Sequence, residues 1–342
     1  MQEARDISIH LILEERFGNG EEVLSSLDQQ SLQNFQVVML GQIEGGREPE
    51  RADDGRTMWL RNYRHRGFAR IHNQAMALAL SRWSQQDLDR RFIVLCHPDL
   101  VWDASALERM YRAFQQDPNL MIAGPTLLRA RRVPQDDEGG YEVERTEERE
   151  SRGIGLTRGR RWIEVPIQGD DQEPHTVFGV SEPCFMMRAS AAQALMIAGE
   201  VLDPDLYPGQ EVPDLMWRAA WLGMSVKIIT QAKVWHYAHR PARQDHFLKR
   251  IKDWYAPTAK QERLANAPYS LMELKNDDPW LRIVHAPWIL WERLAYLGKC
   301  LLDPRMCLAP FDPERWLRIR SKRVELKKRR RVTRQRMREQ LT

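Results

Sequence analysis

The stretch FIVLCHPDL, residues 92–100, joins an apolar segment to side chains that can bind a metal ion or a phosphate. Residues 92–95 suit a buried strand, and His97 and Asp99 offer an imidazole and a carboxylate just beyond it. Pro98 and Asp99 are also common turn residues, so an ordinary turn is the simpler alternative. Open α/β sheets bind ligands at the carboxyl ends of their strands, which makes this stretch a candidate ligand site.

The segments before this stretch alternate between strand and helix patterns. Residues 7–13 (ISIHLIL) and 35–40 (FQVVML) have the composition of strands, and residues 21–30 carry Val23, Leu24 and Leu27 at helical spacing. The first forty residues therefore predict a β-α-β unit, which is the building block of a parallel sheet.

The pattern continues through the next 160 residues. Helices are predicted at 67–80, after a possible N-cap at Asp103, from about Ser190, and at 211–222 with Gly223 as the stop. Further strands are predicted at 120–128, within 175–188, at 225–229 and at 232–239, and the polar residues 131–151 predict an exposed insertion.

Length and composition fit a soluble, two-domain protein. The chain has 342 residues, of which 42% are hydrophobic and 29% charged. Its four cysteines form no CxxC pair, which argues against a zinc ribbon or a disulfide framework and fits a reducing compartment. The first residues lack a secretory signal pattern, and no stretch has the roughly 18 apolar residues that span a bilayer. A cytoplasmic location is expected.

The C-terminal third has a different character. Residues 241–311 predict a helical, tryptophan-rich region, and residues 312–342 a basic tail. Within it, residues 280–302 fit either a helix packed on the body or an interfacial amphipathic segment. Residues 315–338 contain thirteen Lys or Arg and one acid, Glu325, a charge of +12, whereas the rest of the chain carries −8.

This charge asymmetry predicts a polyanionic partner for the basic segment. Each Lys or Arg near anionic lipid contributes about 1 kcal/mol to the free energy of membrane binding. Residues 315–338 are therefore expected to bind an anionic membrane surface, on the inner face of the membrane. Nucleic acid is the weaker alternative and is not expected, because the segment has only Trp316 for base stacking. A solvated helix without a partner is the simplest alternative.

The order of these segments resembles that of the GT-A glycosyltransferases of family 2, in particular the rhamnosyltransferase-like branch of bacterial polysaccharide synthesis. The resemblance covers roughly residues 7–240. It rests on the order and spacing of several motifs rather than on any one of them: ISIHLIL, Asn62 followed by GFARIHNQA, FIVLCHPDL, AGPTLLR, RGIGLTRGRRW, EPCFMMRASAAQAL, EVPDLMWRAAWLG and AKVWHYAH.

The resemblance implies an α/β fold: a GT-A, Rossmann-like mixed sheet flanked by helices over residues 1–240, with a helical C-terminal extension. It implies a nucleoside-diphosphate sugar as donor and Mn²⁺ or Mg²⁺ as cofactor. A divalent cation offsets the charge that builds up on the diphosphate leaving group, and hard oxygen ligands suit it.

Individual roles also follow from the resemblance. Asp99 matches the last carboxylate of the DxD-type metal motif, and His97 stands where this branch has Asp or Asn. His236 resembles a downstream histidine that completes the metal shell, and imidazole binds Mn²⁺ more readily than Mg²⁺. Asn62, Gly67, Asn73 and His97 are assigned to the donor. The alternative for His236 is an ordinary strand-end histidine.

Inverting transfer needs a base for the acceptor hydroxyl. Glu211 matches the glutamate of the family's ED-containing helix, and Asp214 is the second candidate. The aspartate that directly follows the family's glutamate is replaced by Val212. Acids at a helix start also complement the helix dipole without any catalytic role, which is the simpler alternative for this pair.

The sequence departs from the family at His97, at Val212, and after the first and second strands. The leading hypothesis is a glycosyltransferase that extends a polysaccharide or lipid-linked glycan. The alternative is a non-catalytic GT-A-like scaffold subunit of a polysaccharide assembly complex, since a fold can persist after its function is lost.

Overall fold

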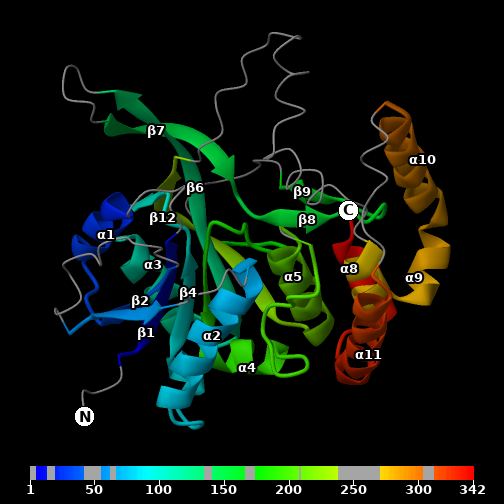
Figure 1. The fold of residues 1–342 in the computed structure, drawn as a ribbon, viewed down its shortest axis with the longest axis horizontal. Coiled ribbons are helices and arrows are strands. Elements are labelled where there is room, and N and C mark those ends of the chain that lie inside the picture. The colour runs from blue at the N-terminus through cyan, green and yellow to red at the C-terminus, as the bar shows by residue number, and fades with distance from the viewer. Residues whose placement is uncertain are drawn as a thin grey trace.

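The computed structural model describes residues 5–13, 20–41, 55–61, 67–134, 141–165, 174–207, 209–237, 270–302 and 312–342. A ten-stranded mixed sheet lies at its centre (Figure 1). One half of the sheet is parallel, in the order β3-β2-β1-β4, and consists of β3 (Thr57–Arg61), β2 (Phe35–Gly41), β1 (Ile7–Leu13) and β4 (Phe92–Cys96). The predicted β-α-β unit is confirmed, with α1 (Glu21–Asp28) as its helix.

The other half of the sheet is mixed. β11 (Cys184–Arg188) runs antiparallel between β4 and β6 (Leu120–Pro134), and β12 (Ser225–His236) is parallel to β6. The short strands β5 (Leu100–Trp102) and β10 (His175–Thr176) pair antiparallel with β12. A separate two-stranded sheet joins β8 (Ile154–Leu156) to β9 (Trp162–Glu164).

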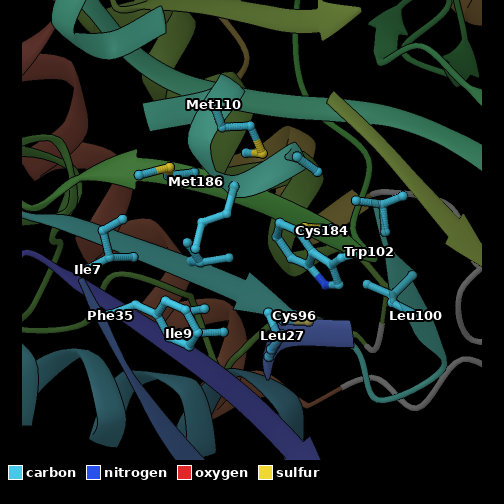
Figure 2. Close-up of a cluster of buried hydrophobic side chains, with 14 of the residues drawn as sticks. Ile7, Ile9, Leu27, Phe35, Cys96, Leu100, Trp102, Met110, Cys184 and Met186 are labelled. Atoms are coloured by element: carbon cyan, nitrogen blue, oxygen red, sulfur yellow. The ribbon is translucent and has the colours of Figure 1, made fainter. Parts of the chain in front are cut away.

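Alternating side chains along the strands divide the core into two layers. Val94 and Cys96 of β4 pack with α1 and α3 (Ala106–Gln116), whereas Ile93 and Leu95 pack on the opposite face of the sheet. That second face is covered by α2 (Gly67–Arg82), α4 (Ala189–Leu195) and α5 (Glu211–Leu222), and η3 (Leu88–Arg90) adds Leu88 to it. Figure 2 shows part of the first layer, where Cys96, Cys184 and Trp102 come together.

Helix boundaries follow the local sequence closely. Leu107, Met110 and Phe114 of α3 are buried on one face, as their spacing predicts. The N-cap of α3 is Ser105 rather than Asp103, and the Asp103 carboxylate accepts the backbone N–H of Ser105 instead. Gly223 ends α5 in the left-handed conformation with φ 72°, which glycine adopts without a steric penalty.

Two predictions need correction. Residues 131–151 are predicted as an exposed insertion, and the described ones are largely exposed, but they also form strands: β6 extends to Pro134, and β7 (Tyr141–Ser151) pairs antiparallel with it. Residues 225–236 form the single strand β12, in which an irregularity between Ile229 and Lys233 takes the place of the predicted break.

The C-terminal region consists of helices that lie together at one side of the sheet (Figure 1). They are α8 (Ser270–Asn276), α9 (Pro279–Val284), α10 (Ala286–Leu302), α11 (Pro313–Arg329) and α12 (Arg334–Gln340). Ile319, Met337 and Leu341 are buried with Trp217 and Trp221 of α5 in one hydrophobic cluster. The basic segment is therefore part of the packed body rather than a detached tail. No helix in the described ranges is long and apolar enough to cross a membrane.

Candidate functional site

Three side chains from two strand ends meet at one point of the sheet. β4 ends at Cys96, and β5 begins at Leu100, opposite His236 in β12. This pairing turns the connecting residues 97–99 toward the end of β12. The backbone N–H of Tyr237 donates to the carbonyl of Asp99 at 3.1 Å and fixes the two segments together.

The cluster has the composition and spacing of a metal site. It consists of His97, Asp99 and His236 and is here called the metal-ligand cluster. One ligand atom from each of the three lies within 4.8 Å of the others. His236 Nε2 is 3.3 Å from Asp99 Oδ2, and His97 Nδ1 is 3.9 Å from Asp99 Oδ1. Asp99 Oδ1 and His97 Nε2 are buried and have no hydrogen-bond partner among the described residues. Buried polar atoms are normally satisfied, so these two atoms fit a site that is completed by a cation.

Electrostatics within the cluster keep Asp99 ionised. Burial by itself raises the pKa of Asp99, but hydrogen bonding to His236 and the charges of both histidines lower it below its ordinary value. Burial likewise lowers the pKa of His236, whereas hydrogen bonds to Asp99 and Glu150 raise it to about 9. His236 is thus protonated at neutral pH, and a bound cation has to displace that proton.

Neighbouring residues hold the ligands in place. His236 Nδ1 lies 2.8 Å from Glu150 Oε2, so β7 fixes the orientation of the imidazole ring. The ring of His97 packs edge-on against the ring of Phe68, with centroids 5.9 Å apart. The backbone N–H of His97 donates to the carbonyl of Pro183 at 3.0 Å. The Tyr237 hydroxyl donates to the carbonyl of Pro98 at 3.1 Å.

Glu211 lies in the first turn of α5 and is only 5% exposed. Burial and the negative charge of Glu182 raise its pKa to about 8. Glu211 Oε2 has no hydrogen-bond partner in the described part of the chain. Glu182 acts on Glu211 by its charge and directly precedes Pro183, whose carbonyl accepts the backbone N–H of His97, so Glu211 and His97 share a neighbouring segment. A buried carboxyl with a raised pKa and a free oxygen is suited to accept a proton from a substrate.

Asp214 is in a different environment, although it is only three residues further along α5. It is fully buried. Its Oδ2 accepts hydrogen bonds from Arg218 at 2.9 Å and Lys275 at 2.7 Å, and its Oδ1 accepts one from Asn276 at 2.7 Å. Lys275 also binds Asp203. These bonds tie α5 to α8, so the geometry favours Glu211 over Asp214 as the base.

Of the residues that the sequence assigns to the donor, the structure describes Gly67, Asn73 and His97. Gly67 directly precedes Phe68, whose ring packs against His97. Both side-chain polar atoms of Asn73 bind the backbone of Leu202, at 2.7 and 2.8 Å, so this amide joins α2 to the 202 segment and is not free for a donor. Gly67 starts α2 with φ 74° and has open space around it. Asn62 lies outside the described residues, and His97 is in the metal-ligand cluster.

Glu150 and Glu182 are site residues that sequence reasoning misses. Glu150 belongs to a run of charged residues, RTEERES, in which no spacing distinguishes it from its neighbours. Only the pairing of β6 with β7 and with β12 brings it to His236. Glu182 directly precedes Pro183, and no local pattern predicts that it lies beside Glu211.

No protein-family model matches the chain, and no curated protein sequence matches it. Among solved structures, a crystal structure of GalNAc-T7 with UDP, GalNAc and Mn²⁺ superposes with a TM-score of 0.50 at 11% identity. The match covers 83% of this chain and 55% of the other. The chain has a GT-A fold. S. aureus TarS gives a TM-score of 0.44 at 13% identity over 79% of this chain and 43% of its own.

The mannosyltransferase PcManGT from Pyrobaculum calidifontis, in complex with GDP-Man and Mn²⁺, gives a TM-score of 0.42 at 14% identity. That match covers 95% of this chain and 86% of the other. This chain spans about half the length of the GalNAc-T7 chain. At 11% identity the likeness to GalNAc-T7 shows the fold alone. The metal-ligand cluster of this GT-A fold lies beyond the carboxyl end of β4, where an open α/β sheet binds its ligands.

Proposed function

We propose that the chain is a glycosyltransferase that moves a sugar from a nucleoside-diphosphate donor to a polysaccharide or lipid-linked glycan, with inversion at the anomeric carbon. The observation that carries this proposal is the convergence of His97, Asp99 and His236 at the carboxyl end of β4 in a GT-A fold. The crystal structure of GalNAc-T7, which has this fold, contains UDP, a sugar and Mn²⁺.

His97, Asp99 and His236 would hold the divalent cation. When bound, the cation offsets negative charge on the diphosphate as it leaves the sugar. Two imidazoles beside one carboxylate favour Mn²⁺ over Mg²⁺, which prefers oxygen ligands alone. Asp99, which is ionised, would supply a ligand oxygen without losing a proton, whereas His236 would have to release one.

Glu211 acts as the base in this proposal. Its ionised form takes the proton of the acceptor hydroxyl while that oxygen attacks the anomeric carbon opposite the diphosphate. The raised pKa makes the carboxylate a stronger proton acceptor than an exposed glutamate. The charge of Glu182 contributes to this raised pKa, so the ionised form of Glu211 becomes the main form only as the pH approaches 8.

The second candidate is the non-catalytic scaffold. It is favoured because α5 has no second free carboxylate beside Glu211. Val212, at the position of the family's aspartate, is buried in the core, and Asp214 accepts hydrogen bonds from three donors. In that case the metal-ligand cluster would be a remnant, and the protein would bind no nucleotide.

Calorimetric titration of UDP, dTDP, GDP and CDP, with and without Mn²⁺, separates the two candidates. We expect one nucleotide to bind in a Mn²⁺-dependent manner, and Asp99→Ala to abolish that binding. Asp117→Asn is the matched control, because Asp117 is a carboxylate that pairs with Lys227 outside the site. Failure of all four nucleotides to bind would support the scaffold and contradict the transferase.

Membrane association on the inner face is part of the proposal, since a lipid-linked acceptor resides there. In the packed segment 315–338, Arg318, Lys322 and Arg330 pair with acids of the body. Exposed cations in the same segment have no partner among the described residues: Arg320, Lys327, Lys328, Arg331, Arg336 and Arg338. These remaining side chains support attraction to an anionic surface.

A further inference from the structure

The outer face of α10 is apolar. Leu290, Trp291, Leu294, Leu297 and Leu301, here called the α10 strip, follow helical spacing and lie on one side of the helix. Trp291 is 71% exposed and Leu301 85% exposed, and the other three are exposed by more than half. Ile283 of α9 is exposed as well. Single exposed apolar residues are ordinary, but a contiguous row of large ones marks an interaction surface.

The polar residues of α10 point toward the protein instead. Arg293 donates to both carboxylate oxygens of the buried Glu273 at 2.6 Å, and Glu292 lies 3.9 Å from Arg161. An amphipathic helix on a globular body normally turns its apolar side inward. The orientation of α10 is therefore inverted, and its apolar side is left for something outside the described chain. Figure 1 shows α10 at the edge of the molecule, above α9, with α8 and α11 nearer the sheet.

Cations surround the base of α10. The Arg158 guanidinium lies 5.5 Å from the centre of the Trp288 ring, and Arg158 is exposed. At the junction between α9 and α10, burial and the charges of Arg160, Arg158 and Arg338 lower the pKa of His285 to about 4. Exposed Arg158 and Arg338 thus lie near the start of α10, so an anionic surface that receives the α10 strip meets cations near one end of the helix.

We propose that α9 and α10 form a membrane-docking element, with the α10 strip inserted at the headgroup–acyl boundary of an anionic bilayer. The helix is too short and too polar on its inner side to span a bilayer, so it lies in the plane of the surface. Tryptophan beside leucine is the composition that interfacial helices use. A second copy of the chain fits this face less well, because pairing it would bring like-charged arginines together.

This inference concerns docking and does not depend on sugar transfer. The test is co-sedimentation of the full-length protein with vesicles of phosphatidylcholine and phosphatidylglycerol, compared with phosphatidylcholine alone. We expect binding to the anionic vesicles, and a fall of about tenfold or more in partitioning for Trp291→Ser/Leu294→Ser, because burial of each large apolar side chain is worth at least that factor. Brominated lipid should quench tryptophan fluorescence less in Trp291→Phe than in the wild type.

The control is Val133→Ser, which removes an exposed apolar side chain from β6, outside both α10 and the basic segment. We expect this variant to partition like the wild type, and all variants to keep the wild-type melting temperature. Partitioning of Trp291→Ser/Leu294→Ser that equals that of the Val133→Ser control overturns the proposal. A large fall in melting temperature for Trp291→Ser/Leu294→Ser overturns it too, since the strip would then pack within the chain. The proposal is also overturned if the wild type is a dimer that Trp291→Ser/Leu294→Ser dissociates while vesicle binding is unchanged.

Discussion

Burial determines the chemistry of Glu211. Its carboxyl group lies in the first turn of α5, beside Glu182 and away from solvent, and its pKa is raised to about 8. Since a general base has to be ionised, transfer should speed up as the pH rises toward 8. Glu211→Gln should lower kcat by roughly 10²–10⁴, the usual contribution of a positioned base. Steady-state kinetics with the donor found by calorimetry measures both effects, and full activity of Glu211→Gln would exclude this residue as the base.

The same residue makes folding stability depend on pH. The folded protein holds the Glu211 proton up to about pH 8, whereas the unfolded chain loses it near its ordinary value of 4.5. Between these values the folded state binds more protons, so stability is fully present below pH 4.5 and falls by about 1.4 kcal/mol per pH unit as the pH rises toward 8. Glu211→Gln should remove this slope and be the more stable protein above pH 8. Urea titrations at several pH values test the sign.

Glu150 holds His236 of the metal-ligand cluster in place, and substituting it tests how much the cluster depends on that contact. It binds the ring nitrogen of His236 that faces away from Asp99, so it fixes the orientation of that ring. Loss of such a partner typically costs 10–100-fold in metal affinity. We expect Glu150→Gln to weaken Mn²⁺ binding by about this factor, measured by electron paramagnetic resonance of free Mn²⁺. Glu147→Gln, on the same strand but paired with Lys233, should bind Mn²⁺ as the wild type does.

At the scale of elements, α5 serves two purposes. Its first residue, Glu211, is the candidate base, while Asp214, one turn later, binds α8 through Lys275 and Asn276. Asp203, Asp205 and Asp214 are balanced by Arg218, Lys275 and Lys322 in one buried network. The position of the candidate base therefore depends on the docking of the C-terminal helices against α5.

Removing one charge from this network should be costly. Asp214→Asn leaves Arg218 and Lys275 with one carboxylate fewer in a buried site, and breaking a buried ion pair costs about 3–5 kcal/mol. Urea denaturation should show this loss of stability, while Glu147→Gln, at an exposed pair, should cost less than about 1 kcal/mol. An unchanged stability for Asp214→Asn would show that its carboxylate is not part of the scaffold.

For the whole molecule, the basic C-terminal segment completes the fold. Ile319, Leu326 and Met337 are buried, and Lys322 joins α11 to Asp203 and Asp205. Met337→Ala should lower the free energy of unfolding by about 2–5 kcal/mol, as for other buried methionines. Removal of residues 312–342 should lower the melting temperature sharply. A truncated protein that melts like the full chain would mean that the segment is a detachable tail after all.

The sequence by itself determined the elements of the central sheet and the helices that cover it. Apolar runs such as ISIHLIL and FIVLC become the central strands, and the spacing of Leu107, Met110 and Phe114 becomes the buried face of α3. It also predicted Asp99 and His236 as metal ligands and His97 as a donor-site residue, and the structure brings these three side chains together beyond the end of β4. These are local or order-dependent properties, which the residues of one segment are sufficient to encode.

Only the tertiary structure decided what those residues contact. Glu211 and Asp214 have the same chemistry in the sequence, but different packing leaves one oxygen of Glu211 free and binds both oxygens of Asp214. Likewise, thirteen cations predict a free tail until the acids of the 203–205 and 277–278 segments are brought to them. Pairings across a hundred residues depend on how the layers stack, and no local pattern of the sequence records that arrangement.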